Sequence, residues 1–151
     1  MAQRPSFDMS KMSLADKILL GAGLLYVIDS FLPWQRACAG LGGVDFCVSR
    51  SLWAGVGIIA ALAAIALVVV VGASVVASAS MPALPPLAVP ALAGAVLVFT
   101  ILKIIIDNEA LGFAAWIGLV LSLAIAYGGW LKMQATRATA TGYTPPAPPA
   151  V

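Results

Sequence analysis

Hydrophobic positions along the chain gather into four long segments separated by short polar stretches. A helix rises about 1.5 Å per residue, so roughly 20 apolar residues cross a hydrocarbon core of about 30 Å. Residues 52–76 and 110–131 contain no charged side chain, and residues 87–106 contain only Lys103. Residues 14–32 are less uniform because they include three charged side chains. The pattern predicts four transmembrane helices over these ranges, packed as an all-α four-helix bundle.

The first of these segments has recognisable signals at both ends. Ser13 is followed three residues later by Asp16, as in a capping box with the serine as N-cap and the carboxylate near the positive end of the helix. Pro33 cannot donate a backbone hydrogen bond, and it disfavours helical geometry in the residue before it. We therefore expect the first helix to begin after Ser13 and to end near Phe31 or Leu32.

Polar and proline-rich stretches connect and flank the apolar segments. Residues 81–90 (MPALPPLAVP) contain four prolines, which predicts a stiff connector. Residues 107–109 (Asp-Asn-Glu) predict a tight turn that caps the fourth helix, and residues 33–51 are expected to form an outer loop. The tail 1–13 is expected to be cytoplasmic. The Pro-rich tail 132–151 is expected to be cytoplasmic and disordered, with local polyproline II structure that a polyproline-reading domain is able to bind.

Basic and aromatic residues indicate how the chain is threaded. Placing both ends in the cytoplasm follows the positive-inside rule, because more basic residues then lie inside than outside. The inner set is Arg4, Lys11, Lys17, Lys132 and Arg137, and the outer set is Arg36, Arg50 and Lys103. Trp34 and Trp53 flank the outer loop, and Trp130 lies near the inner boundary. We predict an N-in/C-in topology with these three tryptophans as interface anchors.

Composition narrows the class of protein further. The chain is 62% hydrophobic and only 9% charged, with a mean hydropathy of +1.06, whereas soluble domains carry about 25% charged residues. This composition is typical of a multi-pass protein of the plasma membrane. A net charge of +2 gives no basic surface for nucleic acid. Histidine is absent, which removes the commonest general base and metal ligand. We therefore expect no catalytic residues, no metal site and no cofactor.

Two cysteines lie in the predicted outer loop. Cys38 and Cys47 flank a glycine-rich stretch that lets them meet, and an extracytoplasmic location permits their oxidation. We predict a structural disulfide between them; a redox-active pair is the alternative, although neither cysteine has a CxxC partner or a histidine to lower its pKa. Two further readings of this region are signal-peptide cleavage at residues 37–39 (Ala-Cys-Ala) and a lipoprotein anchor at Cys38.

Asp29 is an ionisable residue in an otherwise apolar stretch. It lies in the last turn of the first predicted helix, where the helix dipole disfavours an anion. Lys103 lies at a similar depth in the third predicted helix, so we predict an intramembrane ion pair between Asp29 and Lys103. Three alternatives stay open: Asp29 reaches the headgroups or is protonated, Lys103 extends to the interface, or Lys103 pairs with its i+4 neighbour Asp107.

Glycine and alanine recur along all four predicted helices. Small residues in membrane helices let neighbouring backbones pack closely, which is the interpretation we favour; a groove for a partner is the alternative. Residues 20–29 and 93–102 share a small-residue start and an aromatic residue at the same offset. A duplicated helical hairpin is a second hypothesis that this similarity raises.

The motif IDSFLPW (28–34) is the most distinctive part of a longer pattern. It closes the stretch ADKILLGAGLLYVIDSFLPW, which is followed by a short loop with cysteines, the PALPPL connector and the closing stretch FAAWIGLVLSLAIAYGGWLK. Over roughly residues 14–132, the chain resembles a family of small four-span membrane proteins from actinobacteria. The resemblance implies a topology and assigns no catalytic residue.

The expected function follows by elimination. Transporters usually show polar residues or broken helices at mid-membrane, whereas residues 52–76 are uninterrupted. We expect a non-enzymatic integral membrane protein, an accessory, scaffolding or assembly subunit of a plasma-membrane complex. Its expected partners are the lipid bilayer and either another protein or further copies of itself. The alternative is a small oligomeric channel or proton-coupled transporter that uses Asp29.

Overall fold

The computed structural model describes residues 9–76 and 84–142. These residues form four α-helices, one two-stranded antiparallel sheet and a short 3-10 turn at Met9–Lys11. In chain order the elements are α1 (Leu14–Asp29), β1 (Gln35–Leu41), β2 (Val44–Arg50), α2 (Gly57–Val76), α3 (Ala88–Ile106) and α4 (Phe113–Ala140).

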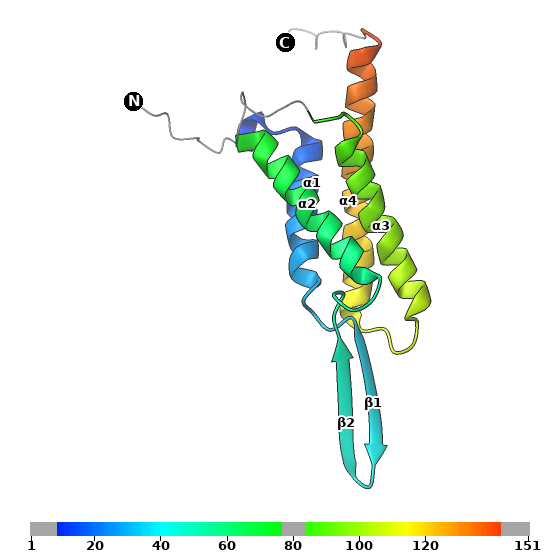
Figure 1. Ribbon diagram of the computed structural model, residues 1–151. Coiled ribbons are helices and arrows are strands. Elements are labelled where there is room, and N and C mark those ends of the chain that lie inside the picture. Colours follow the sequence, from blue (N-terminus) through cyan, green and yellow to red (C-terminus); the bar gives the residue numbers. More distant parts are fainter. Residues whose placement is uncertain (1–8, 77–83, 143–151) are drawn as a thin grey trace, which may run out of the picture.

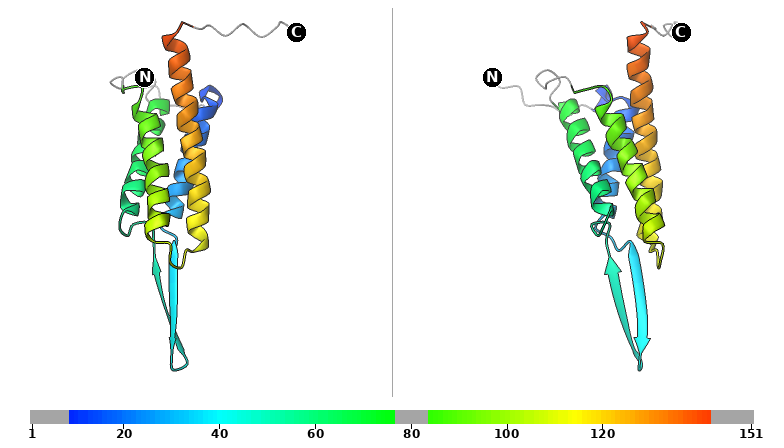
Figure 2. Two further views of the ribbon diagram at one scale, coloured as in Figure 1. Left: turned by 90° about the vertical axis from the view of Figure 1, so that its right-hand side faces the viewer. Right: turned by 45° about the vertical axis from the view of Figure 1, so that its right-hand side comes forward.

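The helices lie side by side, and the sheet projects from one end of them (Figures 1 and 2). α1 packs against α2 and α4, and α3 packs against the same two helices, so α1 and α3 are diagonal neighbours. α1 begins and α4 ends at one end of the bundle, while the β1–β2 hairpin extends from the opposite end (Figure 1).

The structure corrects the prediction of an all-α four-span bundle. Among the described residues, three helices are long and apolar enough to cross a membrane, namely α2, α3 and α4. α1 has only 16 residues, or about 24 Å of helix, which is less than the thickness of a hydrocarbon core of about 30 Å. With the hairpin, the protein is a small mixed α/β structure. The predicted N-in/C-in topology assumed that the chain crosses the membrane four times, so it fails together with the four-span fold.

Both ends of α1 have clear physical causes. Ser13 is the N-cap, as predicted, and its hydroxyl oxygen accepts a hydrogen bond from the backbone N–H of Asp16 at 3.2 Å. The Asp16 carboxylate also forms an ion pair of 2.6 Å with Lys132 of α4. The helix ends at Asp29, slightly earlier than expected, and a turn follows in which the N–H of Leu32 donates to the carbonyl of Asp29 at 3.0 Å.

Small residues let the helices approach closely. Alanines make up much of the buried core, including Ala60, Ala64, Ala93 and Ala115. A Cβ added at Gly129 of α4 would lie 2.6 Å from the Cβ of Ala93 in α3. The buried positions are therefore filled by short side chains and close backbones, as expected for helices packed within a membrane.

The outer faces of the helices are strongly apolar. Large hydrophobic side chains are exposed along all four helices, among them Leu62, Val69, Ile105, Trp116, Val120, Leu123 and Trp130. Exposed apolar surface of this extent is unusual on a soluble monomer. It is what helices in contact with lipid acyl chains present.

Two segment boundaries differ from the sequence expectations. α4 continues to Ala140, beyond the expected end of the last span at residue 131, because residues 132–140 contain good helix formers and the first proline comes only at residue 145. The polar turn 107–109 does not cap α4, since Gly112 is the N-cap and makes no side-chain cap hydrogen bond. Residues 77–83 of the connector region, the start of the N-terminal tail and residues 143–151 lie outside the described residues.

Candidate functional site

The predicted outer loop is a regular β-hairpin. β1 and β2 pair over their full length, from Gln35 opposite Arg50 to Leu41 opposite Val44. Gly42 and Gly43 make the turn with φ angles of 62° and 88°, a left-handed conformation that suits the twist of a two-residue hairpin and that glycine adopts without strain.

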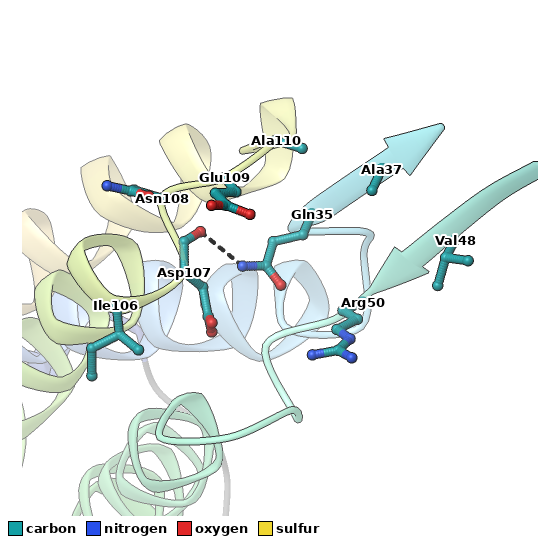
Figure 3. Close-up of a pocket in the computed structure, with 9 residues that line it drawn as sticks. All are labelled: Gln35, Ala37, Val48, Arg50, Ile106, Asp107, Asn108, Glu109 and Ala110. Carbon is teal, nitrogen blue, oxygen red and sulfur yellow. Dashed lines mark hydrogen bonds between the residues drawn. The ribbon is translucent and has the colours of Figure 1, made fainter. Parts of the chain in front are cut away.

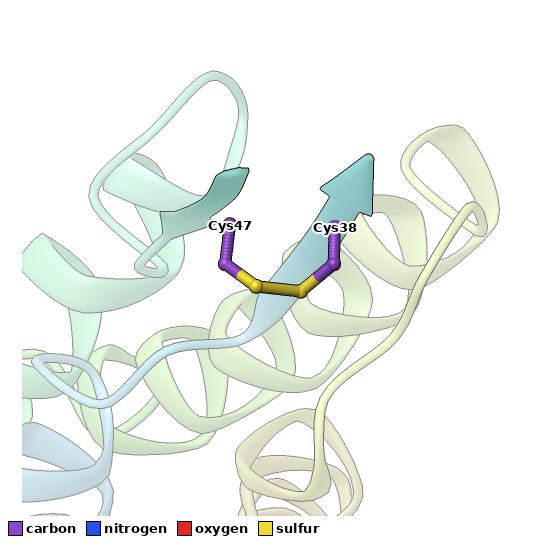
Figure 4. Close-up of a disulfide and its surroundings, with 2 residues drawn as sticks. All are labelled: Cys38 and Cys47. Carbon is purple, nitrogen blue, oxygen red and sulfur yellow. A yellow bond between two sulfur atoms is a disulfide. The ribbon is translucent and has the colours of Figure 1, made fainter. Parts of the chain in front are cut away.

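A disulfide joins the two strands, as predicted for Cys38 and Cys47. These residues lie directly opposite each other in the register, and their sulfurs are bonded across the ribbon (Figure 4). An isolated two-stranded hairpin is only marginally stable in water. The disulfide therefore contributes much of the stability of this hairpin.

The two faces of the hairpin have different chemistry. Residues opposite each other share a face and alternate along each strand. We call one face the apolar face: it consists of Ala37, Ala39, Leu41, Val44, Phe46 and Val48. Its side chains are open to solvent, with Leu41 exposed by 76% and Phe46 by 63%. The other face carries the disulfide with polar residues, Arg36, Asp45 and Ser49 among them.

A groove lies at the base of the apolar face. It has a volume of about 410 Å³ and is bounded by the start of β1, the end of β2 and the α3–α4 connection. Figure 3 shows Gln35 and Arg50 on the hairpin side and Asp107 and Glu109 on the other side. The Gln35 side-chain amide donates to the backbone carbonyl of Asp107 at 2.8 Å. The apolar face thus ends in a polar recess with charges of both signs.

Trp34 connects the hairpin to the helices. Its backbone N–H donates to the carbonyl of Arg50 at 2.9 Å, and its carbonyl accepts from the N–H of Gly112 at 2.6 Å. Its indole Nε1 donates to the backbone carbonyl of Asp29 at 3.0 Å. The side chain is only 1% exposed. We call Trp34 with these three partners the hairpin root.

Gly118 of α4 and Gly112, the N-cap of that helix, make room for this residue. A Cβ added at Gly118 would lie 2.2 Å from the Trp34 ring and 2.8 Å from Oδ2 of Asp29. At Gly112, an added Cβ would lie 2.7 Å from the carbonyl oxygen of Pro33. Small residues were expected to allow close packing between helices. The sequence did not show that two of them accommodate one tryptophan, because this contact depends on how α4 is positioned against the hairpin.

The structure does not bring Asp29 and Lys103 into contact as an ion pair. Lys103 is nearly buried, and its ammonium group pairs with Asp107, which was the i+4 alternative, and donates to the carbonyl of Ala54 at 2.7 Å. Asp29 is 3% exposed. Within the described part of the chain, neither oxygen of its carboxyl group has a hydrogen-bond partner.

The three tryptophans expected at the membrane interfaces lie in different surroundings. Trp34 is buried at the hairpin root and is not a surface anchor. Trp53 is partly buried, donates to the hydroxyl of Ser30 at 3.2 Å and packs against Phe31. Trp130 is 51% exposed on α4, a position from which it is able to reach the lipid interface.

The described residues contain no cluster of three or more cysteine or acidic side chains that could hold a metal ion. Comparison with protein-family models, with curated proteins and with solved structures found no match to this chain. The resemblance to small actinobacterial membrane proteins therefore stays a prediction. The function has to be argued from the geometry of the hairpin and its root.

Proposed function

We propose that this is a non-enzymatic integral protein of the plasma membrane that acts as an accessory or assembly subunit and contacts a partner protein through the apolar face of its hairpin. The observation that carries this proposal is an exposed apolar face on a ribbon that projects from the end of the helices. Contiguous exposed apolar surface on such an element is typical of an interaction site.

Geometry favours a protein over lipid as the occupant of the apolar face. Each strand has seven residues, which corresponds to about 24 Å at about 3.4 Å per residue. A headgroup layer is only about 5–8 Å thick on each side of the hydrocarbon core. The hairpin extends away from the helix ends (Figures 1 and 2). With those helix ends at the edge of the hydrocarbon core, Leu41, Val44 and Phe46 near the turn would lie beyond the headgroup layer.

The arrangement also resembles the anatomy of a protein interface. Interfaces commonly have an apolar centre and a polar rim. Here the apolar face is continuous with the groove, where Ala37 and Val48 meet Arg50 and Glu109. The disulfide holds the ribbon in one shape before any partner arrives, which lowers the ordering cost of binding. The partner we expect is a protein with an apolar extramembrane surface edged by charged residues.

The experiment uses two neighbouring residues on opposite faces. A photo-crosslinking amino acid is placed at Val44 on the apolar face or at Asp45 on the other face, in the full chain in its native membrane. We expect Val44 to yield one defined crosslink to a different protein and Asp45 to yield none. The same protein should copurify at fixed stoichiometry with the unmodified chain. It should be lost with Phe46→Asp, a variant expected to keep its helix content by circular dichroism.

Three outcomes would contradict the proposal. A crosslink from Val44 to a second copy of the chain would show self-association through this face. Crosslinks to lipid would place the hairpin against the bilayer. Equal crosslinking from both positions, or none from either, would show that the apolar face is not a specific contact surface.

The alternative function is a small oligomeric channel or proton-coupled transporter, and the buried carboxyl group of Asp29 is the observation that favours it. Purified protein in liposomes separates the two functions. We expect no proton or ion flux above that of empty liposomes. A flux that the unmodified chain supports and Asp29→Asn abolishes would replace the accessory role with transport.

A further inference from the structure

Asp29 is a buried carboxyl group at the hairpin root with no visible source of neutralising charge. Its side chain is 3% exposed, and within the described residues its two oxygens accept no hydrogen bond. The Trp34 indole gives its hydrogen to the backbone carbonyl of Asp29. An ionised carboxylate in such surroundings is so unfavourable that proteins neutralise it instead.

Among the described residues, the parts of α2, α3 and α4 around Asp29 provide no unpaired cation. On α1 the nearest titratable neighbour is Tyr26, whose hydroxyl bonds to Thr100. On α3, Lys103 pairs with Asp107. α2 contains no charged residue. The remaining charged groups at this end of the bundle are Arg36 and Arg50 at the base of the hairpin and Glu109 of the α3–α4 connection, all of them exposed.

Neither the more distant charges nor the dipole of α1 stabilises the ionised form of Asp29. On α4 the first charged residue is Lys132, which pairs with Asp16 toward the other end of the bundle. Asp29 is also the last residue of α1, where the negative end of the helix dipole opposes a second negative charge. Burial and the helix dipole thus favour the neutral form of the Asp29 carboxyl group, whereas the neighbouring Trp34 indole favours the charged form.

We propose that the Asp29 carboxyl group is a proton-binding site that controls how firmly the hairpin is attached to the helices. In the folded state described here, a proton occupies the site. Loss of this proton leaves a carboxylate that needs water or a donor. The Trp34 ring and the Asp29 carboxyl group lie next to each other against Gly118, since a Cβ added there would be 2.2 Å from the ring and 2.8 Å from Oδ2 of Asp29. The ring therefore covers one side of the carboxyl group, and movement of the indole opens a route for water to reach it.

Movement of Trp34 acts directly on the hairpin. The backbone of this residue holds the end of β2 through Arg50 and the start of α4 through Gly112. When the indole leaves its seat, both hydrogen bonds are strained or broken. The hairpin is then held less firmly, by the remaining bonds from Gln35 to Asp107 and from Arg36 to Ala110. The proton site stands independently of the accessory role proposed above, because it concerns the attachment of the hairpin and not what the hairpin binds.

A hydrophobic carbodiimide tests whether the site holds a proton. Such reagents modify protonated carboxyl groups in apolar surroundings, and the full chain in liposomes is treated with dicyclohexylcarbodiimide over a pH series and mapped by mass spectrometry. A free aspartate, with a pKa of about 3.9, is ionised at about pH 7. We expect Asp29 to be modified at that pH and modification to decline at higher pH. Asp45, which is exposed on the hairpin, is the control and should not react with the hydrophobic reagent.

Hydrogen exchange tests the link to the hairpin. The amides of Trp34 and Gly112 donate the two backbone hydrogen bonds of the hairpin root. Their protection factors are measured over the same pH series after correction for intrinsic exchange. We expect protection to fall about tenfold or more as Asp29 loses its proton. In Asp29→Asn, which mimics the protonated group, protection should stay constant. Amides in the middle of α3 serve as internal controls and should not respond.

Each opposing result overturns the proposal. Absence of carbodiimide modification at Asp29 near neutral pH would show that the group is ionised. Constant protection of Trp34 and Gly112 in the unmodified chain would remove the link to the hairpin, and so would pH-dependent protection that persists in Asp29→Asn. If Asp29→Asn does not fold, the pH profiles of modification and of root protection in the unmodified chain must share one midpoint, and separate midpoints would refute the link.

Discussion

At the scale of single residues, a glycine determines how closely α4 approaches the hairpin root. Gly118 lies against the Trp34 ring and the Asp29 carboxyl group, with no space for a Cβ. We expect Gly118→Ala to lower the free energy of unfolding by about 1–3 kcal/mol, because the ring must leave its position. Gly94→Ala on α3 is the control, since an added Cβ there meets nothing within 4 Å. Denaturation in detergent measures both; equal effects would show that the root is loosely packed.

A hydrogen bond between Tyr26 and Thr100 crosses the centre of the bundle. The two hydroxyl oxygens are 2.5 Å apart. Thr100 gives its own hydrogen to the carbonyl of Val96 at 2.6 Å, so Tyr26 is the donor. We expect a double-mutant cycle with Tyr26→Phe and Thr100→Val to give a coupling energy of about 0.5–1.7 kcal/mol. A coupling energy near zero would mean that the two hydroxyl groups do not depend on each other.

Individual side-chain partners were the least predictable feature. The sequence placed Asp29 and Lys103 at similar depths, but depth along a helix does not fix the direction in which a side chain points. Lys103 reaches Asp107 on its own helix, one turn away. Asp29 points toward Trp34 and Gly118, as the close approach of its Oδ2 to an added Gly118 Cβ shows. The rotation of α1 and α3 about their axes decided the outcome, and apolar helices carry little periodic signal from which to predict that rotation.

At the scale of elements, the disulfide is expected to hold the hairpin and not the helices. It closes a loop with a sequence separation of nine residues, for which constraint of the unfolded chain is worth about 2–3 kcal/mol. We expect Cys38→Ser with Cys47→Ser to lose exchange protection throughout β1 and β2 while far-UV circular dichroism keeps its helical signal. A large loss of helix in this variant would contradict the prediction, since both strands lie outside the helical core.

The helices were easier to predict than the hairpin. Long uncharged runs located α2 and α3 to within a few residues, and Ser13 located the start of α1. The hairpin was missed because its strands contain alanine and glycine, which have low strand propensity. A usable signal was nevertheless present: Gly42-Gly43 lies between two seven-residue stretches, and that dipeptide favours a two-residue hairpin turn.

At the scale of the whole molecule, different interactions stabilise the two ends of the bundle. The hairpin end is held by backbone hydrogen bonds, among them those of Trp34 and the one from Arg36 to Ala110. The other end is held by the ion pair between Asp16 and Lys132. Burial alone would raise the pKa of the Asp16 carboxyl, but hydrogen bonds from Lys132 and Ser13 outweigh it and the pKa is lowered.

The sign of the resulting pH dependence follows from this lowered pKa. The stabilisation by Asp16 is fully present above its unfolded pKa of about 3.9, and it is lost as the pH falls through the lower folded value. We expect Lys132→Ala to cost on the order of 1 kcal/mol near neutral pH, because the pair is partly exposed. Lys132→Arg should retain most of the stability. A loss in Lys132→Ala that is equally large below the folded pKa of Asp16 would show that packing, and not charge, is responsible.

The interactions at the two ends of the bundle should contribute independently to the free energy of unfolding. Gly118 and Lys132 are 14 residues apart on α4, about 21 Å along the helix, and their contacts have no residue in common. Substitutions this far apart usually add to within about 0.5 kcal/mol. We therefore expect the double variant Gly118→Ala with Lys132→Ala to lose the sum of the two single losses in detergent denaturation. A double loss that differs from the sum by more than about 1 kcal/mol would mean that α4 transmits strain along its length, so that a change at the hairpin root is felt at the opposite end of the bundle.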